Sequence, residues 1–252
     1  MVDRRSGRAV VVGGLVLALA VLVVAVVVVL AGQDRPIGYQ GEPGSLSLAE
    51  VDGPAAADDD GGIPLGSELV AGTVNEGAAV VEVVFDYRCP WCAEFEKIHG
   101  PELEALAEEG TVTLVLRPVS FLDERAEGSR QYSTRSATAA AVVADRAPEH
   151  FLAFHLALMQ NQPGKGEGPS DADIAAVARQ AGVPEDVVAA LDDTRDGGER
   201  LFARWVFAAT ERADEILGGL TTPSVLVDGQ VLDLEPLFGT PGAVRAAVED
   251  LL

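Results

Sequence analysis

The sequence predicts an α/β fold that follows a single transmembrane helix. Three observations predict it: a strand, a helix and a second strand in that order over residues 79–117, helical patterns over residues 133–217, and a β-hairpin with a helix after residue 223. Strand patterns combined with helical patterns are typical of a sheet covered by helices. We therefore expect one domain over residues 63–252, with a helical insertion at about 133–217.

The first part of this domain is a β-α-β unit. Residues 79–86, AVVEVVFD, are rich in β-branched side chains and favour a buried strand. Residues 111–117, TVTLVLR, alternate and favour a second strand, and apolar residues at near-helical spacing over residues 90–109 predict the helix between them. We expect Pro101 to kink or break this helix, because proline lacks the N–H donor of an inner helical position.

The insertion is predicted to consist of several helices. Ser170 and Asp173 form a pattern similar to a capping box, and Pro184 suits the first turn of a helix. Trp205 lies in an apolar helical stretch, LFARWVFAA, and is expected in the core.

The end of the chain returns to strand character. Residues 224–227 and 231–232 favour two short strands around Asp228-Gly229, a hairpin signal. Thr240-Pro241 then suits the start of a last helix that ends at Leu252.

An apolar segment precedes the domain. Residues 9–31 are 23 residues without a charge, enough for a helix to cross a hydrocarbon core of roughly 30 Å. Arg4, Arg5 and Arg8 precede this segment, so the positive-inside rule places residues 1–8 in the cytoplasm and the catalytic domain outside it. A cleaved signal peptide is the alternative, but its apolar core is normally about 7–15 residues long. The length therefore favours a retained single-pass anchor in the cell membrane.

Residues 32–62 are expected to form a flexible linker. They are rich in Gly, Pro, Ala and acidic side chains and show no apolar periodicity. The adjacent Asp58, Asp59 and Asp60 could suggest calcium ligands, but they lack the glycine and the distal glutamate of a calcium-binding loop. We expect these carboxylates to be solvated.

Charge and cysteine content exclude several classes of function. Lys and Arg number 18 against 40 Asp and Glu, so the formal net charge is −22, which would repel a phosphate backbone. We therefore expect no nucleic-acid partner. Cys89 and Cys92 are the two cysteines of the sequence, which excludes a multi-disulfide scaffold and a four-thiolate zinc site within one chain.

The two cysteines form a C-x-x-C motif, Cys89-Pro90-Trp91-Cys92, directly after a predicted strand and at the start of a predicted helix. The first turn of a helix has unpaired N–H groups and the positive end of the dipole, so a sulfur there is stabilised as thiolate. Cys89 is therefore predicted as the nucleophile. Cys92, three residues later, lies within disulfide reach and can resolve a mixed disulfide at Cys89. Pro90 fits the turn because its missing N–H would be unpaired anyway.

With its surroundings, this motif resembles the DsbA-like thiol-disulfide oxidoreductases of the thioredoxin superfamily. The resemblance covers residues 63–252 and rests on FDYRCPWCAEFE after a strand, on the helical block, and on TTPSVLVDG. It implies a thioredoxin fold with a helical insertion and a redox pair of Cys89 and Cys92. It also implies that the Thr222–Pro223 peptide is cis, that Pro223 packs beside the disulfide, and that Thr222 offers its backbone to an extended substrate segment.

The sequence departs from the family pattern at two positions. Many members have a buried carboxylate six residues before the first cysteine, where this chain has Val83, and Glu82 lies one residue earlier. Because a shift of one residue turns a strand side chain to the other face, the proton acceptor for Cys92 is left open between water, Asp86 and Glu96.

The second departure lies inside the motif. Trp91 stands where strongly oxidising members carry a histidine, so the thiolate lacks the stabilisation that an imidazolium would give. Trp91 is expected at the rim of the site in contact with clients, and packing against the domain is its alternative.

The two cysteines also allow interpretations other than redox chemistry. They could form an inert disulfide or be two buried thiols, but neither needs a strand-to-helix junction. A zinc site would need His99, His150 or His155 as further ligands, and each lies in a helical pattern typical of packed or exposed residues. We therefore expect no metal site.

These observations predict a single-pass membrane protein whose extracytoplasmic domain exchanges disulfides with exported client proteins and oxidises their thiols. No organic cofactor is implied, and a membrane redox partner is expected to reoxidise or reduce the pair. The first alternative is a reductase or isomerase that uses the same cysteines. The second is a client-binding module in which the thiols have no catalytic role.

Overall fold

The computed structural model describes residues 38–39, 41–42, 44–125, 130–162, 168–195 and 198–252. The chain from Ile37 to Leu252 is one compact unit. The predicted anchor at residues 9–31 lies outside the described residues. Within the described part, no helix combines the length and apolar character that crossing a membrane requires.

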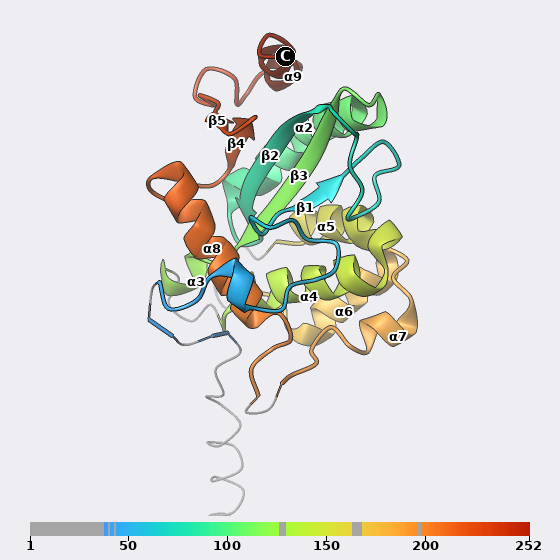
Figure 1. The fold of residues 1–252 in the computed structure, drawn as a ribbon. Coiled ribbons are helices and arrows are strands. Elements are labelled where there is room, and N and C mark those ends of the chain that lie inside the picture. Colours follow the sequence, from blue (N-terminus) through green and yellow to red (C-terminus); the bar gives the residue numbers. More distant parts are fainter. Residues whose placement is uncertain (1–37, 40, 43, 126–129, 163–167, 196–197) are drawn as a thin grey trace, which may run out of the picture. The chain divides into compact units, whose positions relative to one another are not determined.

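A five-stranded mixed sheet forms the centre of this unit (Figure 1), with the strand order β1-β3-β2-β4-β5. Strands β2 and β3 are parallel, and the other neighbouring pairs are antiparallel. The strands span β1 (Ile63–Leu65), β2 (Ala79–Asp86), β3 (Val112–Val119), β4 (Ser224–Val227) and β5 (Gln230–Val231).

The predicted strands are confirmed, with β2 at its predicted bounds and β3 two residues longer at its end. All eight residues of β3 are buried, although its sequence alternates. The reason is that polar side chains on β3 find partners: Arg117 forms a bidentate ion pair with Glu82 at 2.9 and 2.7 Å. Strand β1, an edge strand of three residues, was not predicted.

Two helices cover opposite faces of the sheet. Phe95 and Leu103 of α2 (Pro90–Glu108) pack in one apolar cluster with Val83 of β2. Ala213 of α8 (Ala203–Leu217) packs in a second cluster with Val84, the next residue of β2. Because consecutive strand residues point to opposite faces, β2 is buried on both sides. The C-terminal α9 (Ala243–Glu249) contacts α2 and begins three residues after the predicted start at Thr240.

Pro101 does not break α2, because the helix runs on to Glu108, and a kink at this residue stays a prediction. Pro101 is exposed, and so is the side chain of Lys97, whose carbonyl would receive the missing N–H. On this solvent side of the helix, water can bond to the carbonyl instead, which lowers the cost of the proline.

The helical insertion between β3 and β4 is confirmed, and its helices gather below the sheet in Figure 1. At the start of α6, Ser170 Oγ accepts a bond from Asp173 N and Asp173 Oδ2 accepts one from Ser170 N, which is the predicted capping box. Trp205 is 2% exposed and lies in the core as expected. The helices before α8 are α3 (Leu122–Arg125), α4 (Tyr132–Arg146), α5 (Phe151–Gln160), α6 (Asp171–Gln180) and α7 (Glu185–Val188).

The described part of the predicted linker packs on the domain. Gly53 lies against Trp205 and Gly61 against Ala209, at distances that leave no room for a Cβ atom. Because these positions have no side chain, the backbone can lie directly on α8. Gly53 and Gly61 therefore belong to the packed domain rather than to a flexible linker.

Asp58 and Asp60, two of the three consecutive acids of this segment, have structural partners. Asp58 Oδ1 accepts bonds from Asp60 N and Gly62 N, and Asp60 forms an ion pair with Arg212 at 2.8 Å. These contacts close a turn and attach it to α8.

Candidate functional site

The cysteine motif lies where β2 ends and α2 begins. Cys89 is the residue that precedes the helix, with extended backbone angles, and Pro90 is the first helical residue. The carbonyl of Cys89 accepts bonds from Cys92 N at 3.0 Å and Ala93 N at 3.3 Å. No side chain caps this helix start, and the backbone N–H groups of Trp91 and Cys92 instead help to stabilise the Cys89 thiolate.

Both cysteines are free thiols, and the environment lowers the pKa of Cys89 to about 6. The largest cause is a hydrogen bond from the thiol of Cys92, and burial opposes it. Bonds from Thr222 and from the backbone N–H groups of Cys92 and Trp91 lower the pKa further. These donors favour the thiolate, the form that attacks disulfides.

The pKa of Cys92 changes in the opposite direction and lies well above its usual range. Burial is the main cause, and the neighbouring Cys89 thiolate adds to it. The two sulfur atoms therefore hold one negative charge and one proton between them, with the charge on Cys89. This agrees with the prediction that Cys89 is the low-pKa thiol.

The loop before β4 meets the cysteines. The Thr222–Pro223 peptide is cis, as the resemblance implied, and Cys89 Sγ lies 3.4 Å from the Thr222 carbonyl oxygen, to which the protonated thiol can donate a hydrogen bond. The structure thus brings together residues that are separated by more than 130 positions in the sequence.

Trp91 is 64% exposed, and its ring lies edge-on against Phe238 with 5.8 Å between centroids. Phe238 comes from the loop after β5 and also packs against Phe95 of α2. Packing against the domain, the alternative for Trp91, therefore describes one side of the ring, and contact of the exposed side with clients stays a prediction.

The carboxylate of Glu82 lies on the sheet face away from α2. This agrees with its place one residue before the position at which many family members have a buried carboxylate. Glu82 is held there by Arg117, which is 1% exposed. Its side chain therefore does not share the face on which Val83 packs with α2.

Asp86 is completely buried at the end of β2, and burial raises its pKa to about 7. Its oxygens accept bonds from Arg88 N at 2.8 Å and Leu122 N at 3.1 Å. Asp86 thus holds the backbone that leads into the cysteine turn.

Glu96, one turn after Cys92, is directed to the insertion. Its carboxylate lies 3.3 Å from His155 Nε2, and His155 Nδ1 lies 3.2 Å from the hydroxyl of Tyr87. His155 is fully buried, so this network joins the turn between β2 and the motif, the helix after the motif and α5.

The hydrogen bonds and ion pairs of the three histidines are with groups other than the two sulfur atoms. His99 Nε2 bonds to the carbonyl of Phe238 at 2.9 Å, and His150 lies 3.8 Å from Glu149. In the described ranges, no three His, Cys, Asp or Glu side chains form a group that could hold a metal ion.

Sequence reasoning missed one contact to the motif. Gln162 Nε2, from the segment after α5, donates a hydrogen bond to the carbonyl of Cys89 at 3.0 Å. A single glutamine after a helix carries no local signal for this role, so only the folded arrangement reveals it.

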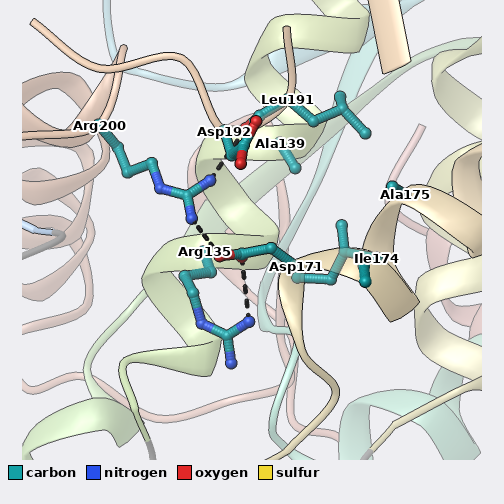
Figure 2. A pocket seen from close by; sticks show the side chains of 9 residues that line it. Arg135, Ala139, Asp171, Ile174, Ala175, Leu191, Asp192 and Arg200 are labelled. Atoms are coloured by element: carbon teal, nitrogen blue, oxygen red, sulfur yellow. Dashed lines mark hydrogen bonds and ion pairs between the residues drawn. The ribbon is translucent and has the colours of Figure 1, made fainter. Parts of the chain in front are cut away.

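The insertion also contains a pocket of about 220 Å³, which Figure 2 shows from close by. Arg135 and Arg200 reach Asp171 from two sides, at 3.1 and 2.6 Å. Asp192 also lines the pocket, so two cations and two carboxylates balance in formal charge. The ion pairs of Arg135 and Arg200 with Asp171 link α4, α6 and the segment before α8. Neither cysteine lines this pocket.

Comparison with known families gives a match over most of the chain. The family model Thioredoxin_4, described as thioredoxin, matches residues 67–245. No curated protein matches at a significant level.

Solved structures with a similar fold include several thiol-disulfide oxidoreductases. MdbA from Actinomyces oris, a thiol-disulfide oxidoreductase, is 26% identical, with a TM-score of 0.64 over 82% of this chain and 93% of that chain. DsbG from Mycobacterium tuberculosis, a disulfide bond oxidoreductase in its reduced form, is 27% identical, with a TM-score of 0.59 over 77% and 88%. Reduced DsbA from the same organism is 25% identical, with a TM-score of 0.55 over 76% and 100%.

Proposed function

This chain belongs to the thioredoxin family, and we propose that it is a protein thiol-disulfide oxidoreductase that forms disulfide bonds in exported proteins. One observation carries the proposal: a buried pair of thiols at a helix start, in which the pKa of Cys89 is lowered and that of Cys92 is raised. A low-pKa sulfur is a good leaving group in disulfide exchange. The likeness to the named oxidoreductases supports the same chemistry.

The reaction starts from the oxidised enzyme, in which Cys89 and Cys92 form a disulfide. A client thiolate attacks Cys89 Sγ, the S–S bond breaks, and Cys92 leaves and takes up a proton because its pKa is high. A second client thiolate attacks the client sulfur of the mixed disulfide and releases Cys89 as a thiolate. The client gains a disulfide, and two electrons pass to the enzyme.

The pKa values favour oxidation of clients over their reduction. The bonds that stabilise the Cys89 thiolate exist in the reduced enzyme, so they stabilise the reduced state relative to the disulfide. A reductase or isomerase with the same cysteines is the second candidate. A reduction potential measured against glutathione separates the two directions.

The client-binding surface of this proposal lies around the Cys89 sulfur. The backbone of Thr222, next to Pro223 and 3.4 Å from Cys89 Sγ, can pair with an extended client segment in the manner of an added strand. The exposed part of Trp91, two residues after Cys89, adds an apolar contact.

The location is part of the proposal. Residues 9–31 anchor the chain in the cell membrane, with residues 1–8 in the cytoplasm and the catalytic domain outside. A partner in the membrane removes the two electrons from the reduced pair. The sequence supports this placement through its apolar length and its flanking arginines.

The experiment uses the full chain and its Cys92→Ser variant. Without the second thiol, Cys89 mixed disulfides with exported proteins should accumulate and appear as reducible adducts on gels. Adducts should be absent from the Cys89→Ser, Cys92→Ser double variant. If the Cys92→Ser chain forms no adducts that depend on Cys89, the proposal of client oxidation is wrong.

The same preparations test the client-binding alternative and the retention of the membrane anchor. A double variant that still binds clients with unchanged affinity, together with a wild type that does not oxidise them, would indicate a client-binding module. Membrane-extracted chain should retain its N-terminus. A mature start near Gly32 and release by a salt wash would indicate a cleaved signal peptide.

A further inference from the structure

Gln162 contacts the cysteine turn from outside α2. Its side-chain amide donates to the carbonyl of Cys89 at 3.0 Å and also lies 3.4 Å from Met159 Sδ. The other two donors to the Cys89 carbonyl, the N–H groups of Cys92 and Ala93, belong to α2 itself. Gln162 thus supplies the hydrogen bond from the helical insertion to this carbonyl.

The insertion holds Gln162 in a fixed place. Helix α5 ends two residues earlier, and its buried Phe154 and Leu158 pack in the main apolar core. His155 of the same helix bonds to Tyr87, which lies two residues before Cys89. Because α5 is attached to the strand that leads into the motif, the segment after α5 lies beside the motif.

The carbonyl and the sulfur of Cys89 depend on the same turn, because Cys92 N donates to this carbonyl at 3.0 Å and also helps to lower the pKa of the thiol. The backbone N–H groups of Trp91 and Cys92 help to lower the pKa of Cys89, so the thiolate depends on the orientation of this turn. A donor that holds the carbonyl from the side opposes rotation of this peptide. The donor end of the Gln162 amide also points its positive side toward the turn that holds the thiolate.

We propose that Gln162 is a positioning residue that keeps the Cys89 thiolate in its hydrogen bonds and so lets the helical insertion set the reactivity of the motif. This rests on the proposed function, because it takes Cys89 as the attacking thiol. It assigns to the insertion a direct effect on the chemistry in addition to its packing.

The test compares the full chain with Gln162→Met, which keeps a side chain of similar length but has no N–H donor. The rate at which Cys89 is alkylated is measured against pH, with the modified site identified by mass spectrometry. We expect the midpoint to rise by about half a pKa unit or more, so that the thiolate fraction near pH 6 falls about two-fold. Gln162→Glu should raise it further, because a carboxylate brings negative charge to the turn.

The matched control is Asn161→Ala. The amide of Asn161 bonds to the Ala157 carbonyl within α5, so its loss should leave the Cys89 midpoint unchanged. A Gln162→Met midpoint equal to that of the wild type would overturn the inference. A midpoint that moves equally in Asn161→Ala would also overturn it, because the effect would then come from disturbance of α5.

A second measurement applies if the variants fold poorly. In the wild-type chain labelled with ¹⁵N, the side-chain amide resonances of Gln162 should shift with the same midpoint as the Cys89 thiol. Resonances that do not respond to this titration would overturn the inference. A wild-type Cys89 that titrates like a free cysteine would instead contradict the proposed function, so the two failures are distinguishable.

Discussion

Two helix starts in this protein, those of α2 and α6, hold an anionic side chain in different ways. Helix α6 has a complete capping box at Ser170, and its first residue, Asp171, is paired with two buried arginines. Helix α2 has no side-chain cap, and the residue at its start is Cys89. Both use the same local field, in which free N–H groups and the helix dipole favour negative charge.

The difference supports the proposal that the α2 start is reactive, whereas the α6 start is structural. At α6, side chains of the protein bond to both the N–H groups and the carboxylate, so nothing is left for a substrate. At α2, the N–H groups bond to a sulfur that can exchange its partner. A helix start becomes a chemical site when the atom that it stabilises can form a covalent bond.

The largest expected effect is the titration of Cys89 in the reduced chain. Its alkylation rate should reach half its maximum near pH 6, whereas a free cysteine titrates near about 8.5. The thiolate fraction rises as pH increases through this midpoint, because the donors of the turn favour the charged form. Alkylation followed by mass spectrometry gives the midpoint for each cysteine, and a faster reaction at Cys92 would reverse the assignment.

The titration also has a consequence for stability. Because the folded pKa of Cys89 lies below the unfolded one, the thiolate contributes stability to the reduced chain above the unfolded pKa. That contribution is lost as pH falls through about 6.

The second effect concerns the α6 start. Asp171→Ala leaves the buried Arg135 and Arg200 without their shared carboxylate, so the free energy of unfolding should fall by about 2–4 kcal/mol. Denaturant unfolding measures this change. Asp192→Ala, on the exposed side of the same pocket, should change it by less than about 0.5 kcal/mol. A changed Cys89 midpoint in Asp171→Ala would contradict the separation of the two sites.

The smallest effect is expected from the cap of α6. Ser170→Ala removes the acceptor for the N–H of Asp173 and should lower the free energy of unfolding by about 1 kcal/mol. Thermal unfolding of the reduced chain at one pH checks this value. Equal stability of variant and wild type would mean that the capping box contributes nothing measurable.

The sequence by itself determined the features that have a local pattern. The β-branched run of β2, the capping box at Ser170 and the Cys89–Cys92 motif each lie within a few residues, and their neighbours carry the signal. The strand period even placed Glu82 on the sheet face away from α2, because neighbouring strand residues alternate between faces.

The tertiary structure decided the contacts between residues far apart in the chain. The carbonyl of Thr222 beside Cys89 was expected only from the family resemblance, and the bond from Gln162 was not expected at all. The packing of Gly53 on Trp205 was also missed, because a Gly-rich segment has the same composition whether it is flexible or lies flat on a helix. These contacts depend on which surfaces meet when the core forms, and a side chain carries no periodic signal for a partner on another element.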